Sequence, residues 1–462
     1  MALSTPDYRA IGRLAYPLIV SGMIQASFNV SDTWFVGRLS TDATAAIAAV
    51  NWLDYCGVLL FSGLAMAVQT NAARAYGSGR HAAASRALWS GVFASLLTIP
   101  CFLLLGLLAR PILLYVGIDP VIRRLALLYW WPRFALAAPI TVLAMSVSAF
   151  FSAIGQTRKT LLIAAAMCVS NAMFNELFMF HWRYGIAGSG FATATAAMLG
   201  VLFGGALLLS PHMRRVFRTH VTWRRPQLLR QFSMGVPIGM GLAVDMLAFA
   251  MMQLMVVRLG ATQGAAIQIV TALIAVPYVV GSGISEAGMT LVAQEFGRRR
   301  TAAALAVGGA TIRLTVAAMA ILGLCVAISM PWLAPLFASR AGATSAAVRT
   351  LCVVLVGPAM LFQACDGWKL ASNFCLMGVG DVRIPAVLAT ALAWLLWVPA
   401  AHVFIFGFPG GWAHARSLAG LGANGGWWAS VLYSLVMGSL LYGRWRRATW
   451  QRATSSVSAV PG

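Results

Sequence analysis

The sequence predicts an all-α integral membrane protein in which twelve transmembrane helices form two similar halves. Its composition indicates the class: 60% of the 462 residues are hydrophobic and 10% are charged, with a mean hydropathy of +0.81. An ordinary soluble domain carries about 25% charged residues, so this chain has too little polar surface to cover a water-facing exterior. The number of helices follows from the apolar stretches, and their arrangement from an internal repeat.

The apolar stretches are about 20 residues long, enough for each to cross a hydrocarbon core of about 30 Å as a helix. We expect twelve spans, near residues 12–36, 44–73, 88–109, 125–152, 160–181, 186–210, 232–257, 265–293, 302–330, 348–376, 384–407 and 424–443.

The internal repeat relates Pro17 in YPLIVSGMIQ to Pro237 in VPIGMGLAVD. The spacing between these two prolines, which we call the repeat offset, also relates Arg38 to Arg258, and it continues further along both halves. Duplicated hydrophobic units are how many secondary transporters build two halves around a central site. The sequence therefore predicts an N-lobe over 11–210, a cytoplasmic linker over 211–231, a C-lobe over 232–443 and a cytoplasmic tail over 444–462.

Pro17 and Pro237 each lie inside the first span of a half, where proline removes a backbone hydrogen bond and bends a helix. The surrounding glycines allow close helix packing. Two compatible interpretations follow: packing through small residues, and helices that bend during a transport cycle.

The net charge of +22 is distributed unevenly across the predicted spans. If the N-terminus is cytoplasmic, 22 of the 33 basic residues lie in inside segments and ten lie outside, Arg133 among them; Lys369 lies within a span. This positive-inside bias predicts cytoplasmic termini and an attraction to anionic lipid, and it argues against a nucleic-acid partner.

Only eleven acidic residues exist, and several fall within predicted spans. A carboxylate in mid-membrane costs about 3 kcal/mol even on lenient scales, so such residues are candidates for function. We assign Asp32, Asp245 and Asp366 to cation or proton coupling. Asp381 and other acids at span ends are expected to be solvated.

Further polar side chains near these acids are candidates for an accessory or cavity-lining role. Asn29 lies three residues before Asp32 on one helix face, and Asn171 and Asn175 lie four residues apart beside Glu176. The remaining candidates are Asp54, Gln25, Gln363 and Met252. Asp54 and Glu176 could equally join two helices through a buried hydrogen bond, and Met252 could be plain packing.

Lys369 follows Asp366 by three residues, a spacing at which the two side chains can form an ion pair on one helix. The pair could be structural, or it could hold Asp366 ionised until a substrate or cation arrives.

Three runs of sequence, YPLIVSGMIQASFNVSDTWFVGRLSTDATAAIA, GLAMAVQTNAARAYGSGR and FQACD with GVGDVR beyond it, resemble the multidrug and toxic-compound extrusion (MATE) family, in particular its NorM-type bacterial branch. The resemblance covers nearly the whole chain. It implies two six-helix lobes forming a V, and export of substrate against an inward Na⁺ or H⁺ gradient. It also matches Asp32, Asp245 and Asp366 to the family's functional acids, of which the last two form the cation site in Na⁺-linked relatives.

The chain departs from the family pattern at four positions. Asp245 replaces a more usual glutamate, Phe362 stands where relatives can offer a tyrosine hydroxyl, Lys369 adds a positive charge, and Met179 stands where proton-coupled relatives have an aspartate. These departures leave the coupling ion open between Na⁺ and H⁺.

We therefore expect a monomeric multidrug efflux antiporter of the inner (plasma) membrane, without cofactor or resident metal, that exports amphipathic or cationic organic compounds. A lipid-linked oligosaccharide flippase is the alternative transporter, disfavoured because Lys369 is the only buried base that the spans predict. An ion channel lacks a re-entrant filter segment, and an intramembrane enzyme lacks a catalytic motif.

Overall fold

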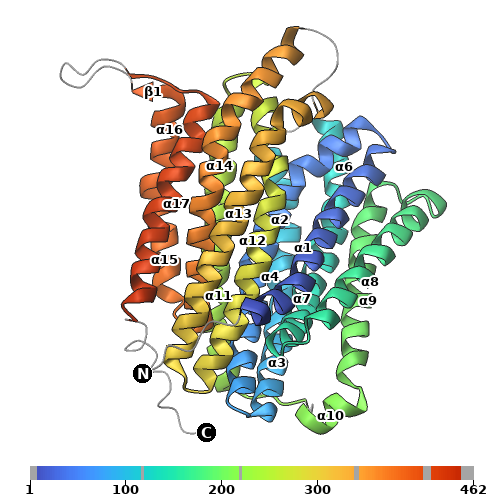
Figure 1. Ribbon diagram of the computed structural model, residues 1–462. Coiled ribbons are helices and arrows are strands. Elements are labelled where there is room, and N and C mark those ends of the chain that lie inside the picture. Colours follow the sequence, from blue (N-terminus) through green and yellow to red (C-terminus); the bar gives the residue numbers. More distant parts are fainter. Residues whose placement is uncertain (1–7, 116–118, 218–220, 338–342, 409–417, 449–462) are drawn as a thin grey trace. The chain divides into compact units, whose positions relative to one another are not determined.

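The computed structural model describes residues 8–115, 119–217, 221–337, 343–408 and 418–448, and these are almost entirely helical (Figure 1). The first half contains α1 Tyr8–Gly37, α2 Thr41–Gly77, α3 His81–Leu96, α4 Ile99–Leu107, α5 Ala109–Tyr115, α6 Pro120–Trp131, the π-helical turn η1 Pro132–Ala137, α7 Ala138–Ala153, α8 Thr157–Asn175, the π-helical turn η2 Glu176–His181, and α9 Ile186–Leu208.

The short α10 Pro211–Phe217 follows. The second half contains α11 Arg225–Val257, α12 Ala261–Gly297, α13 Thr301–Phe337, α14 Ala343–Gly378, α15 Arg383–Leu392, the π-helical turn η3 Ala393–Trp397, α16 Val398–Phe406 and α17 Ala423–Arg446. Two-residue strands, β1 Gly407–Phe408 and β2 Leu418–Ala419, pair antiparallel between α16 and α17.

Ten helical segments within the described ranges are long and apolar enough to cross a membrane. They coincide with ten of the twelve predicted spans. At the other two predicted positions lie α1 and α17, which are helical over 30 and 24 residues but carry more polar side chains. Those polar side chains include Asp32 in α1 and Tyr433 and Ser434 in α17.

The repeat is visible in the helix boundaries themselves. When the repeat offset is applied, the first and last residues of α2 fall on the first and last residues of α12, the end of α1 falls on the end of α11, and the start of α3 falls on the start of α13. The register is lost later: the ends of α7 and α14 are separated by more than the repeat offset, and β1 and β2 lengthen the last connection of the second half.

Local sequence explains several boundaries. The Ser40 hydroxyl accepts a hydrogen bond from the Ala43 amide at 3.0 Å and so caps α2. The Asp119 carboxylate caps α6 in the same way through Val121, with Pro120 at the first helical position, where its missing N–H costs nothing.

The chain divides into two compact units. We call Tyr16–Ala243 with Ala293–Thr301 the N-terminal unit, and Met1–Ala15 with Val244–Val292 and Ala302–Gly462 the C-terminal unit. These units are not the predicted lobes, whose boundaries at 11–210 and 232–443 stay a prediction. The predicted linker 211–231 contains α10 and the start of α11, and residues 218–220 and 449–462 lie outside the described residues.

Within the N-terminal unit, glycines allow helix ends to meet backbone to backbone. A Cβ added to Gly77 would lie 2.1 Å from the Gln294 carbonyl oxygen, and one added to Gly297 would lie 2.2 Å from the Arg74 carbonyl oxygen. Gly77 and Gly297 are themselves related by the repeat offset, as are Arg74 and Gln294. The repeat thus produces a two-fold contact in which each glycine receives the backbone of its counterpart's helix.

Candidate functional site

The second half gathers a charged cluster from three helices of the C-terminal unit. The ammonium of Lys369, on α14, lies 3.2 Å from Asp245 Oδ2 on α11 and 2.9 Å from Asp366 Oδ1 on α14. From α17, the Tyr433 hydroxyl donates a short hydrogen bond to Asp245 Oδ1, and the Ser434 hydroxyl lies 3.4 Å from Asp366 Oδ1. The expected Lys369–Asp366 ion pair is confirmed, and Asp245 joins it.

The close approach of α17 to α14 brings the Ser434 hydroxyl to Asp366, whereas the Tyr433 hydroxyl reaches Asp245 on α11. Helices α17 and α14 lie side by side (Figure 1). A Cβ added to Gly438, one turn after Ser434, would lie 3.3 Å from the Lys369 amide nitrogen. Small residues of this kind let helix backbones pack closely in a membrane.

The members of the cluster differ in exposure. The Asp366 and Lys369 side chains are 5% and 13% exposed, whereas Asp245 is 29% exposed. Asp245 is therefore the carboxylate that a molecule from outside the cluster would meet first.

Buried aromatic rings pack beside it. The Tyr433 ring stacks on Trp397 with 4.5 Å between centroids, and the Lys369 ammonium lies 5.0 Å from the centre of the Tyr433 ring. Phe362 packs against Trp427, and the hydroxyl that reaches Asp245 is that of Tyr433. The sequence analysis missed Tyr433; the available signal was its place beside Ser434 in the last predicted span.

The first half holds a different cluster, built in the N-terminal unit around Asp32 of α1. The Asn175 amide donates to Asp32 Oδ1 at 2.7 Å, and the Thr193 hydroxyl of α9 lies 3.3 Å from Asp32 Oδ2. Asn175 also donates to Asn171 Oδ1 at 3.0 Å. The sequence analysis grouped Asn171 and Asn175 with Glu176 and Asp32 with Asn29; the structure instead brings Asn171 and Asn175 to Asp32, together with Thr193. All four side chains are buried.

A buried ion pair lies elsewhere in the same unit. The Arg133 guanidinium, on the π-helical turn η1, lies 2.8 Å from Asp54 Oδ2 on α2, and the two side chains are 15% and 4% exposed. This corrects the prediction that Arg133 lies in an outside segment and that Lys369 is the only buried base. The geometry fits the interpretation of Asp54 as an acid that joins two helices.

The remaining candidates do not join either cluster. Glu176 pairs at 2.9 Å with Arg38, both side chains being over 40% exposed, and Asn29 and Gln25 are exposed on α1. Gln363 is buried and donates to the Ile274 carbonyl at 2.7 Å.

Two further expectations are corrected by burial. Met252 is 1% exposed, and its sulfur packs closely against Gly426. It therefore belongs to the core and does not line a cavity. Asp381 was expected to be solvated, yet it is 5% exposed and pairs with Arg444. Pro17 and Pro237 lie inside continuous helices, α1 and α11, as predicted.

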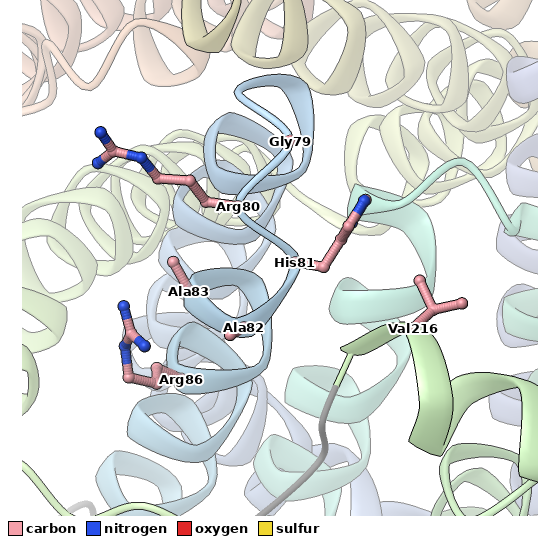
Figure 2. A pocket seen from close by; sticks show the side chains of 7 residues that line it. All are labelled: Gly79, Arg80, His81, Ala82, Ala83, Arg86 and Val216. Atoms are coloured by element: carbon pink, nitrogen blue, oxygen red, sulfur yellow. The ribbon is translucent and has the colours of Figure 1, made fainter.

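A surface pocket of about 410 Å³ lies at the turn between α2 and α3 and contains none of the predicted site residues. Figure 2 shows Arg80 and Arg86 on one side of this turn, with His81 directed away from them. As for a metal, no three His, Cys, Asp or Glu side chains in the described part of the chain converge to hold one. Oxygen ligands for a cation are present on Asp245 and Asp366, but both carboxylates already contact the Lys369 ammonium. Their other contacts are to the Tyr433 and Ser434 hydroxyls.

Comparison with known proteins adds to this geometry. The MatE family model matches residues 17–177 and 237–403, two stretches that begin on Pro17 and Pro237, the pair that defines the repeat offset. The chain is 30% identical over 434 residues to a probable multidrug resistance protein NorM of Burkholderia mallei, covering 92% of this chain and 90% of that protein. It is 30% identical over 456 residues to the multidrug resistance protein NorM of Burkholderia vietnamiensis, covering 97% and 95%. A crystal structure of MATE in complex with MaL6 superposes with a TM-score of 0.84 at 17% identity, covering 97% of this chain and 98% of that one.

Proposed function

From the premise that this chain belongs to the MatE family of transporters, we propose that it is a secondary active multidrug efflux antiporter. Membership in the family and the matching fold make it an all-α, multi-pass membrane protein. In the proposed cycle, amphipathic or cationic organic compounds leave the cell in exchange for an inward-moving Na⁺ or H⁺. We place the protein in the inner membrane, as a monomer with both termini in the cytoplasm.

The observation that carries this proposal is the burial of carboxylates within helices of the membrane protein. Asp32, on α1, and Asp366, in one of the ten apolar helical segments, are 8% and 4% exposed. Such acids are expensive in a bilayer and typically mark ion or proton pathways. Because binding of an ion or a proton to them changes a buried charge, it can favour one conformation over another, which is the requirement for coupling.

The second-half cluster supports a cationic substrate class. Asp245 offers a partly exposed carboxylate, whereas the stacked rings of Tyr433 and Trp397 beside it are buried. A carboxylate that is accessible within an apolar helical segment attracts a cation by its charge. Multidrug resistance is also what the names of the two Burkholderia relatives record.

The flippase alternative gains nothing from the additional buried base. Arg133 is neutralised by Asp54 at 2.8 Å, so it does not present a free positive charge to an anionic headgroup.

Efflux of a fluorescent organic cation from cells tests the proposal. We expect the Asp245→Asn, Asp366→Asn double variant to lose efflux while remaining in the membrane at wild-type levels. The matched control is Asp42→Asn, at the exposed start of α2, which should retain efflux. Wild-type efflux in the double variant would contradict the proposal.

A further inference from the structure

We propose that the ammonium of Lys369 occupies the position of a coupling metal cation, so that Asp245 and Asp366 work without Na⁺. The inference rests on the proposed coupling role of these two acids and goes further by naming what fills the site between them.

The geometry of Lys369 is that of a bound cation. Its nitrogen lies between two carboxylates from different helices, at 2.9 Å from one oxygen and 3.2 Å from the other, and faces the Tyr433 ring at 5.0 Å. These are ordinary lengths for charged hydrogen bonds between nitrogen and oxygen. A Na⁺ ion would need the same carboxylate oxygens, since hard cations prefer oxygen ligands.

The ammonium also has an advantage over a free ion. Lys369 lies on the same helix as Asp366, three residues away, so its charge is present at a high effective concentration. Na⁺ would have to displace a tethered cation that cannot diffuse away, and the displaced ammonium, 13% exposed, would remain buried without a partner. An unpaired buried charge is strongly unfavourable, so this exchange opposes Na⁺ binding.

The charge balance then indicates what the cluster can exchange. Two carboxylates and one ammonium leave a net charge of −1 when all are ionised. A proton on one carboxylate, or an organic cation at the exposed Asp245, would neutralise it. Both fit without removing Lys369, whereas a metal ion bound between the two acids does not.

The effect of removing the ammonium can therefore be predicted. In Lys369→Met a neutral side chain of similar length leaves Asp245 Oδ2 and Asp366 Oδ1 facing a vacated position, with the Tyr433 and Ser434 hydroxyls bonded to the same carboxylates. This variant should gain a Na⁺ site. Lys369→Arg retains the positive charge and should not gain one.

The experiment measures binding of radioactive Na⁺ to purified protein and the thermal unfolding midpoint in NaCl and in choline chloride. We expect Lys369→Met to bind Na⁺ saturably, at least about tenfold more tightly than the wild type, and to be stabilised by NaCl over choline chloride. We expect the wild type, Lys369→Arg, and the double variant Lys369→Met, Asp366→Asn to show neither effect.

Two results would overturn the inference. One is Na⁺ binding by the wild-type protein that Asp245→Asn or Asp366→Asn abolishes. The other is a Lys369→Met protein that unfolds cooperatively but has no more Na⁺ affinity than the wild type. The wild-type measurement decides the question even if Lys369→Met does not fold. Na⁺ binding and the thermal unfolding midpoint are both measured without transport. A failure of this inference can therefore be told apart from a failure of the antiporter proposal.

Discussion

The two halves of the molecule share their helix boundaries but not their buried chemistry. Helices α2 and α12 coincide at both ends under the repeat offset. The polar clusters do not coincide. In the first half Asp32 accepts its hydrogen bonds from neutral amide and hydroxyl groups, and the guanidinium of Arg133, which pairs with Asp54, acts on it electrostatically without such a bond. In the second half, Asp245 and Asp366 share the ammonium of Lys369 directly.

The counterpart positions show how far the halves have diverged. At the same offset, Asp245 corresponds to Gln25, which is exposed, and Asp32 corresponds to Met252, which is 1% exposed in an apolar core. The repeat therefore preserves the backbone frame, meaning glycines, prolines and helix ends, whereas each half has its own electrostatic site. The predictions that follow test this contrast.

The largest effect is expected at the buried ion pair of the first half. Arg133→Met leaves Asp54, 4% exposed, without its counter-ion, and should lower the free energy of unfolding by about 3–5 kcal/mol. The control is Arg38→Met, whose pair with Glu176 is over 40% exposed and should cost about 0–1 kcal/mol. Denaturant unfolding in detergent micelles measures both, and similar costs for the two variants would mean that the burial of Asp54 has no energetic consequence.

The second prediction compares the carboxylates of the two clusters. Asp366→Asn removes one of two counter-charges from Lys369 and should lower the free energy of unfolding by about 2–3 kcal/mol. Asp32→Asn keeps one acceptor oxygen for its two neutral donors and should cost about 1–2 kcal/mol. The same unfolding assay applies. A larger cost for Asp32→Asn than for Asp366→Asn would contradict the contrast drawn between the two clusters.

The third prediction tests the shared frame. Gly77→Ala and Gly297→Ala each place a methyl group within about 2 Å of a carbonyl oxygen, and each should cost about 1–3 kcal/mol. Gly309→Ala, on α13 with open space around it, should stay within about 0.5 kcal/mol of the wild type. Because the contact is two-fold, the first two variants should have similar unfolding midpoints, and a large difference between them would break that symmetry.

The smallest effects are expected at the neutral hydroxyls. Tyr433→Phe removes a hydrogen bond to the partly exposed Asp245 and should cost about 1–2 kcal/mol, while Thr193→Val removes a neutral donor to Asp32 and should cost about 1 kcal/mol. Efflux provides the second readout: we expect Tyr433→Phe to reduce it, because the variant alters the carboxylate that meets the substrate. Unchanged efflux in Tyr433→Phe would mean that the hydrogen bond from Tyr433 is not needed for the function of Asp245.

Much of the fold could be predicted because hydrophobic length and the repeat act at the level of whole helices. The twelve predicted spans fall on helices, and the pairing of Lys369 with Asp366 follows from their spacing on one helix. Asn175 was recognised as a candidate polar residue, but its meeting with Asp32 was not predicted, since the sequence places it beside Glu176.

What the sequence did not reveal depends on packing between helices distant in the chain. Tyr433 of α17 reaches Asp245 of α11, far from it in the sequence, and Ser434 reaches Asp366 because Gly438 lets α17 approach α14 closely. Arg133 was placed outside the membrane because a charge count along the chain cannot recognise that a π-helical turn directs it at Asp54. Met252 looked like a wall residue because periodicity does not distinguish a cavity from a core.

The measurement that tests ion-coupled efflux, and the inference that Lys369 excludes Na⁺, most directly is uptake of a fluorescent organic cation into proteoliposomes under imposed Na⁺ or H⁺ gradients. We predict that the wild-type protein accumulates the cation only while a pH gradient is present, that exchanging Na⁺ for K⁺ has no effect, and that Asp32→Asn and the Asp245→Asn, Asp366→Asn variant abolish accumulation. Accumulation that continues after both gradients are dissipated, or that survives loss of all three carboxylates, would contradict this mechanism.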